Sequence, residues 1–234
     1  MKPSIYRRNE ALILGTLSLI GIGIVWQLVV DLGLINPFFV SRPTDVFNEL
    51  LLQAQSGILF RNIAESLKSF GLALGLAASV GIVLGLLAGW FRDVEAALNP
   101  FIWFKYSAPT IAFYPIFIAF LGYGTPTIVA IAFLFALTSI YANTLSGIRN
   151  ADRDLVRAAH AFGARPADIF LKVVLPGSVP IVVAGLRLGV GRALTGVVVA
   201  ELFGATAGLG FSIAQHSQRL QTNKMMVSIL VIII

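Results

Sequence analysis

The sequence contains no cysteine and very little charge. The lack of cysteine excludes disulfide bonds, thiolate metal sites and cysteine nucleophiles from all 234 residues. Only 12% of the residues are charged and 57% are hydrophobic, whereas soluble domains carry roughly 25% charged residues. This composition indicates a protein whose surroundings are largely lipid.

The ionisable residues that are present form no cluster. The formal net charge is +6, but Lys and Arg are scattered between apolar runs, with no basic face and no aromatic stacking platform. This pattern argues against nucleic-acid binding and fits the excess of cytoplasmic cations in membrane proteins. His160 and His216 each stand alone, so no metal site is predicted. No nucleophile–base pair is recognisable either, which argues against a membrane enzyme.

Long uncharged runs predict an all-α membrane protein with about six transmembrane helices. A helix needs about 20 apolar residues to cross a bilayer. Residues 11–30 provide the first run. It is longer than the apolar core of a signal peptide and is not followed by the small residues of a cleavage site, so we interpret it as a retained span. The other predicted spans are residues 69–91, residues 99–122 approximately, a span from the turn at 122–126 to residue 148, and residues 178–203. Residues 225–234 reach only about 15 Å as a helix, so they are either a buried half-helix or part of a truncated sixth span, and we expect truncation.

The cations indicate the orientation of the chain. If the N-terminus is cytoplasmic, nine cations lie on that side and five on the outer side, in agreement with the positive-inside bias. The cytoplasmic set is Lys2, Arg7, Arg8, Arg92, Arg149, Arg153, Arg157, Arg165 and Lys172; the outer set is Arg42, Arg61, Lys68, Arg219 and Lys224.

A polar insert at residues 149–176 interrupts the apolar sequence. Residues 152–161 favour a helix with Asp152 near its N-terminus, and Gly163 then breaks the chain. A second helix is predicted to begin at Pro166, and Leu175-Pro176 is predicted to end it before the next span. The insert therefore predicts a cytoplasmic helix–turn–helix that presents a small, smooth surface at Ala158 and Ala159.

This insert resembles the loop of inner-membrane permease subunits of binding-protein-dependent ABC importers. That loop reads Glu-Ala-Ala, three residues, Gly, nine residues, Ile-x-Leu-Pro. Here the corresponding residues, with both spacings intact, are Arg157-Ala158-Ala159, Gly163 and Val173-Val174-Leu175-Pro176. Arg157 replaces the family's Glu and Val173 its Ile. The stretches "SRPTDVFNEL", "SAPTIAFYPIFIAFLGYG" and "GLRLGVGRALTGVVVAE" extend the resemblance to the nitrate, sulfonate and taurine type of permease.

The resemblance implies an ABC permease fold in the bacterial inner membrane, with residues 1–234 as one transmembrane domain and residues 149–176 as its cytoplasmic coupling loop. It implies a homodimer, an external solute-binding protein and two cytoplasmic ATPase subunits. ATP would be used by these partners, because the chain lacks the G-x-x-x-x-G-K-[ST] stretch that cradles phosphates, and the chain itself would bind no cofactor. The implied substrate is a small anion such as a sulfonate, taurine or nitrate, although relatives also carry neutral pyrimidine-type vitamin precursors. The residues implied in coupling to the ATPase are Arg157, Ala158, Ala159, Gly163, Leu175 and Pro176.

Three charges lie within the fifth predicted span: Arg187, Arg192 and Glu201. A charge at the bilayer centre costs at least roughly 2.5–3.5 kcal/mol, so each should face protein or water, and all three are candidates for lining a translocation pathway. The alternatives are snorkelling of Arg187 to the surface, a structural ion pair for Arg192 and a packing role for Glu201. A self-sufficient secondary transporter is the alternative function, although the repeated halves typical of that class are not visible.

Overall fold

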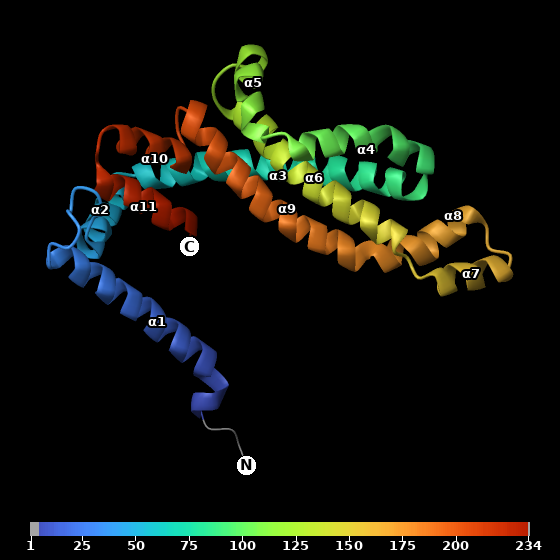
Figure 1. Ribbon diagram of the computed structural model, residues 1–234, viewed down its shortest axis with the longest axis horizontal. Helices are drawn as coiled ribbons and strands as arrows, with labels where there is room; N and C mark the ends of the chain where they lie inside the picture. Colours follow the sequence, from blue (N-terminus) through green and yellow to red (C-terminus); the bar gives the residue numbers. More distant parts are fainter. Residues whose placement is uncertain (1–4, 234) are drawn as a thin grey trace. The chain divides into compact units, whose positions relative to one another are not determined.

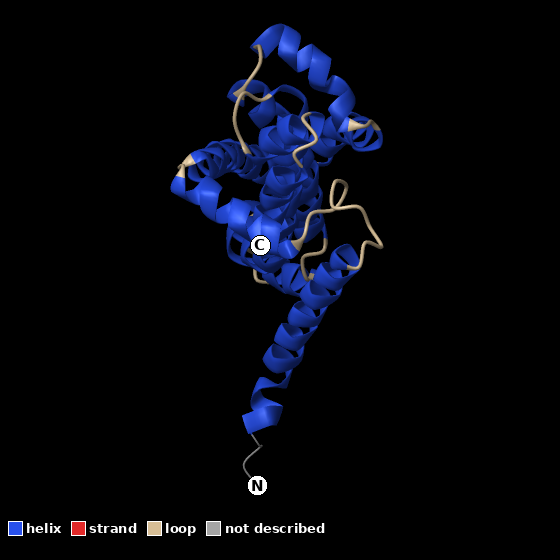
Figure 2. Ribbon diagram, turned by 90° about the vertical axis from the view of Figure 1, so that its left-hand side faces the viewer, coloured by secondary structure: helices blue, strands red, loops and turns tan. Residues whose placement is uncertain are grey.

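The computed structural model describes residues 5–233, with side chains from residue 14; Lys2 of the predicted cytoplasmic set lies outside this range. Every regular element in the described range is a helix (Figure 2), which confirms the all-α class. The helices are α1 (Ile5–Asp31), α2 (Pro43–Gln55), α3 (Ile58–Trp90), α4 (Arg92–Ser107), a 3-10 turn (Thr110–Phe113), α5 (Tyr114–Leu121), α6 (Thr125–Arg149), α7 (Arg153–Ala161), α8 (Pro166–Ile169), a π-helical turn (Phe170–Val174), α9 (Leu175–Gly204), α10 (Leu209–Gln218) and α11 (Thr222–Ile233).

Four of the described helices are long and apolar enough to cross a membrane. They are the Leu14–Asp31 part of α1, α3, α6 and a continuous helix from Pro166 to Gly204. A fifth span is present if α4 and the helical segment Thr110–Leu121 count as one. The apolar helix α11 has only 12 residues. The prediction of six spans is therefore not confirmed.

The third predicted span is bent rather than straight. α4 and the segment Thr110–Leu121 meet at 98°. Ala108 precedes Pro109 and takes an extended conformation (φ −80°, ψ 137°), because the proline ring disfavours a helical residue before it. Pro109 also lacks the N–H that would continue the helix. By contrast, the turn predicted at residues 122–126 is confirmed: α5 ends at Leu121 and α6 begins at Thr125.

The chain divides into two compact units. One contains Met1–Arg61 and Ser212–Ile234, and the other contains Asn62–Phe211. In the first, α2 packs against α11, and Arg42 pairs with Asp31 at 3.0 Å. The apolar side chains of α1 are largely exposed from Leu14 onward, as expected for a helix that faces lipid.

The core of the Asn62–Phe211 unit lies between α3, α6 and α9. α6 and α9 have the most extensive contact in this unit and run side by side in Figure 1. Small and β-branched residues fill the core between the three helices. Among them are Ala73 of α3, Ile131 and Ala132 of α6, and Val197 and Ala200 of α9. Small residues allow helix backbones to approach closely, which is the usual source of helix association in lipid.

The glycines of α3 have two different environments. A Cβ added at Gly85 would lie 2.5 Å from Thr144 Cβ, and one added at Gly89 would lie 2.5 Å from Ile148 Cβ, both on α6. Gly71 and Gly75, in contrast, have open space around the Cβ position. Gly85 and Gly89 are therefore required for packing of α3 against α6 in this unit, and the earlier two are not.

Candidate functional site

The insert folds locally as its sequence indicates. α7 begins after Asp152, whose carboxylate accepts hydrogen bonds from the backbone N–H groups of Asp154 (2.8 Å) and Leu155 (3.4 Å). This is the N-cap arrangement that satisfies otherwise free helix donors. Gly163 has φ +77°, a conformation that favours glycine, and the second helix begins at Pro166.

Replacing Asp152 with alanine is expected to loosen α7. Loss of an N-cap costs about 1 kcal/mol, because two backbone donors lose their acceptor. Amide hydrogen exchange in the first turn of α7 should become roughly fivefold faster. Asp152→Asn keeps an acceptor oxygen and should exchange nearly as slowly as the unaltered protein. If Asp152→Ala exchanged at the same rate as the unaltered protein, the cap would contribute nothing to the stability of α7.

α7 has an inner and an outer face. Val156 and Ala159 pack against the buried cluster of Ile148, Ile169 and Val174. On the outer face Ala158 is exposed between Leu155 and Phe162, whose exposed fractions are 57% and 92%. We name Leu155, Ala158 and Phe162 the α7 apolar stripe; their i, i+3, i+7 spacing places them on one side of the helix.

The remaining residues predicted for coupling have distinct positions. Arg157 forms an exposed ion pair with Asp154. Exposed pairs of this kind contribute little, typically 0–1 kcal/mol by order of magnitude. Gly163 lies in the turn after α7, and no atom lies within 4 Å of its Cβ position. The structure therefore brings Ala158 and Arg157 to the surface, whereas Ala159 is half-buried against the cluster below α7.

The prediction that Leu175-Pro176 ends the second helix is wrong. The helix continues from Pro166 to Gly204. A proline inside a regular α-helix has no N–H for the preceding turn, and its ring meets the carbonyl four residues earlier, here that of Lys172. The chain widens at this point into a π-helical turn, Phe170–Val174, in which Leu175 N–H reaches back to the Phe170 carbonyl. The wider turn accommodates Pro176 without a break.

A second candidate site is a cavity of about 450 Å³ in the same unit, which we name the α4–α6–α9 cavity. Its walls combine aromatic and hydroxyl or amide side chains with three charged groups. The lining residues are Glu95, Ile102, Trp103 and Tyr106 of α4, Thr138, Ser139, Tyr141, Ala142, Asn143, Leu145, Ser146 and Arg149 of α6, and Arg192 of α9.

The charges of this cavity do not cancel. Glu95 is paired with Arg149, whereas Arg192 takes part in no salt bridge among the described residues. Lys105 lies directly behind the wall, where its Nζ donates to Thr138 Oγ1 at 2.9 Å, and its charge is close enough to repel that of Arg192. The cavity therefore has a net positive character that suits an anion.

The three charges predicted in the fifth span are not brought together. Both arginines are exposed, but only Arg192 lines the cavity, and Arg187 lies elsewhere on α9. Glu201 is only 1% exposed, and its carboxylate binds Ser66 and the backbone of Gly210. Sequence reasoning missed the contributions of Lys105 and Thr138, because only the packing of α4 against α6 brings these two residues together.

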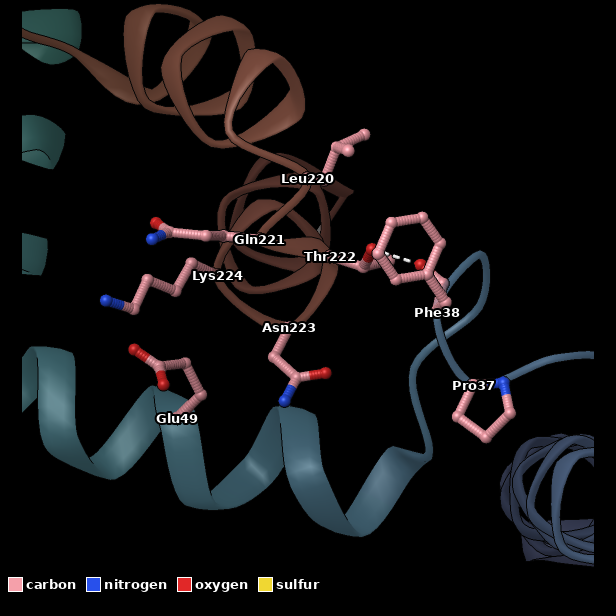
Figure 3. Close-up of a pocket in the computed structure, with 8 residues that line it drawn as sticks. All are labelled: Pro37, Phe38, Glu49, Leu220, Gln221, Thr222, Asn223 and Lys224. Atoms are coloured by element: carbon pink, nitrogen blue, oxygen red, sulfur yellow. Dashed lines mark hydrogen bonds between the residues drawn. The ribbon is translucent and has the colours of Figure 1, made fainter.

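The unit containing Met1–Arg61 and Ser212–Ile234 holds a polar pocket of about 270 Å³ (Figure 3). Thr222 Oγ1 donates to the Phe38 carbonyl at 2.6 Å, which ties the start of α11 to the loop before α2. Glu49 of α2 and Lys224 of α11 both line the pocket. Leu220, which also lines the pocket, has an exposed side chain. Its φ of +56° is an unusual backbone conformation for leucine.

Comparison with known proteins identifies the class to which this helical architecture belongs. Residues 81–234 match the family described as "Binding-protein-dependent transport system inner membrane component". The chain belongs to this family: it is the permease subunit of an ABC importer, a multi-pass inner-membrane protein that works with ATPase subunits and a solute-binding protein. This assignment does not favour the alternative of a self-sufficient carrier.

Individual relatives share most of the chain. The chain is 32% identical to the taurine transport system permease protein TauC of Escherichia coli, over 97% of this chain and 84% of that protein. It is also 32% identical to SsuC of Bacillus subtilis, whose name refers to aliphatic sulfonates transport, over 88% of this chain and 75% of that protein. The formylaminopyrimidine transport permease protein ThiX of Halalkalibacterium halodurans is 28% identical over 88% of this chain and 80% of that protein.

Proposed function

We propose that this permease moves a small organic anion of the sulfonate type, and that the anion passes through the α4–α6–α9 cavity. The observation that carries the proposal is the Arg192 side chain, which lines the cavity and pairs with no carboxylate of the residues that the structure describes. Beside the apolar and aromatic walls of the cavity, an unneutralised cation attracts an anion more strongly than it would in bulk water. Trp103 and Tyr106 would contact the apolar part of such a molecule.

The relatives support this substrate class. The names of TauC and SsuC refer to taurine and aliphatic sulfonates, and both proteins are more similar to this chain than ThiX, whose name refers to formylaminopyrimidine. A sulfonate group carries a full negative charge, also in taurine, where an ammonium group accompanies it, whereas a formylaminopyrimidine offers no anionic group for Arg192 to attract. The charge of the cavity therefore favours the sulfonate class over the pyrimidine class.

We further propose that residues 149–176 dock on the ATPase subunits and that the chain has no ATPase site of its own. The α7 apolar stripe supports this docking, because exposed apolar side chains on a short polar helix are typical of a protein contact. The N-terminus is then cytoplasmic, and two copies of the chain form the pathway. In this orientation Arg219 and Lys224 lie on the outer side, where the solute-binding protein delivers its substrate.

The test of the substrate proposal is ATP hydrolysis by the reconstituted complex. Binding protein loaded with taurine or an alkanesulfonate should stimulate hydrolysis and uptake, and a neutral formylaminopyrimidine should not. Stimulation by the neutral compound alone would overturn the assignment to the sulfonate class while leaving the ABC importer function intact.

Replacing Arg192 with alanine is expected to lower the maximal uptake rate of the anion at least about tenfold, since one charge-assisted contact is worth roughly 1.5–3 kcal/mol. The apparent affinity should change little, because the external protein selects the substrate. Arg187→Ala is the matched control: this arginine lies on the same helix, exposed and outside the cavity lining. Normal uptake by a normally assembled Arg192→Ala complex would remove Arg192 from the pathway.

A further inference from the structure

Three successive backbone N–H groups at the start of α10 are bound by side chains of other helices. The first N–H groups of a helix have no partner within that helix, so they require acceptors from elsewhere. Here α3 supplies two acceptors and α9 supplies the third. The bonds are Gly208 N–H to Asn62 Oδ1 at 3.3 Å, Leu209 N–H to Ser66 Oγ at 2.8 Å and Gly210 N–H to Glu201 Oε2 at 2.8 Å.

Glu201 is the centre of this network. Its carboxylate also accepts from the Ser66 hydroxyl, which lies 2.8 Å from Oε1 and 2.9 Å from Oε2. No salt bridge of the described residues includes Glu201. The carboxylate instead faces the N-terminus of α10, where the helix dipole favours a negative charge. All the residues of the network belong to the Asn62–Phe211 unit.

Glycines at positions 208 and 210 allow the backbone at the start of α10 to approach the Glu201 carboxylate closely. Gly208 has φ +120°, and a Cβ added there would lie 2.4 Å from Glu201 Oε1. A Cβ added at Gly210 would lie 2.5 Å from the Val198 carbonyl oxygen. Side chains at these two positions would push the start of α10 away from Glu201, so the close contact depends on glycine.

A contact of this kind is more costly than apolar packing would be. Burying a charged group costs several kcal/mol, and apolar residues of similar volume often stabilise a fold as well or better. Hydrogen bonds to Ser, Asn and backbone N–H groups have another property: water can replace each of them when the contact opens. The polar character of the contact therefore favours a role in which it forms and breaks.

We propose that Glu201, Ser66 and Asn62 form a latch that holds the start of α10 against α3 in the resting permease and releases it during each transport cycle. We name these three residues and their bonds the Glu201 latch. Glu201 is then a positioning residue that acts on the turn at residues 205–208 and on α10, rather than a charge that contacts the transported anion.

The absence of cysteine from the chain allows a direct test. Leu209 is buried in the latched turn, so a Leu209→Cys side chain should react slowly with a maleimide in the resting complex. Trapping the complex with ATP and vanadate should raise the rate. Glu201→Gln and Ser66→Ala should raise the resting rate roughly 10- to 100-fold, the shift expected from losing a hydrogen bond to a charged group, and trapping should then add little.

Two matched controls accompany the test. Thr206→Cys is exposed in the same turn and should react rapidly in every state. Ser79→Ala removes the same hydroxyl from the same helix, but Ser79 bonds only the Leu76 carbonyl, so the reactivity at position 209 should not change.

Two results would contradict the latch. A resting rate equal to the trapped rate would show that the latch is a static cap, and an unchanged rate in both Glu201→Gln and Ser66→Ala would show that these side chains do not hold the turn. If Leu209→Cys does not assemble with the ATPase subunits, the half-buried Ala207→Cys replaces it as the reporter, with the same expected order of rates.

Discussion

Replacing Ala158 with glutamate is expected to abolish recovery of the ATPase subunits with this permease and, with them, all ATP-driven uptake. Ala158 lies at the centre of the α7 apolar stripe, between the exposed side chains of Leu155 and Phe162. A carboxylate at that position would have to lose its water on docking without gaining a partner, at a cost of several kcal/mol. The measurement is co-purification of ATPase subunits through a tag on the permease.

Two further variants separate docking from folding. Ala158→Ser keeps the position small and should retain the ATPase, and Ala167→Glu makes the same chemical change at an exposed position of α8, outside the stripe. Glutamate at Ala159 is a poorer test, because Ala159 packs against Ile148, Ile169 and Val174 and its replacement would disturb the loop itself. An intact, active complex with Ala158→Glu would overturn the assignment of the stripe as the docking surface.

Replacing Gly196 with leucine is expected to prevent folding. A Cβ at this position of α9 would lie 2.7 Å from the Cα of Ala132 and 3.0 Å from the Cβ of Phe135, both on α6. The first neighbour is backbone, so α6 and α9 would have to separate along the most extensive contact of their unit. Overpacking lowers the free energy of unfolding by about 1–3 kcal/mol where side chains can move aside. A larger loss is expected here, because the backbone of α6 would have to move.

Gly191→Leu is the matched control, since no atom lies within 4 Å of the Cβ position of Gly191, five residues earlier on α9. The yield of monodisperse protein in detergent and its melting temperature should be close to those of the unaltered protein for Gly191→Leu. Both should fall sharply for Gly196→Leu. Equal stability of the two variants would contradict the observed α6–α9 packing.

Local features of this fold were predictable from the sequence. The uncharged runs indicated the spans in α1, α3, α6 and α9, since lipid leaves few alternatives to an apolar helix. Asp152 and Pro166 indicated helix starts because capping and proline geometry depend on neighbouring residues alone. The permease family could also be recognised from the sequence, because the residues of the loop motif around Gly163 lie close together along the chain.

Other features depend on residues that are distant in the sequence. Ser66 and Glu201 are 135 residues apart, so their hydrogen bond has no local signal. The cavity around Arg192 requires the packing of α4, α6 and α9, and Arg192 and Arg187 could not be distinguished before that packing was known. Pro176 was predicted to end a helix on the ordinary local rule, and the π-helical turn that prevents this was not foreseeable from the rule.

The uninterrupted helix from Pro166 to Gly204 has a mechanical consequence. Its 39 residues correspond to a rod of about 58 Å. One end of this rod lies in the loop at residues 149–176, and Glu201 lies three residues before the other end. A continuous helix transmits a tilt at one end as a displacement at the other, so α8 and the Glu201 latch are joined through a single element. The π-helical turn Phe170–Val174 and Pro180 are the places along this helix where bending is expected to concentrate.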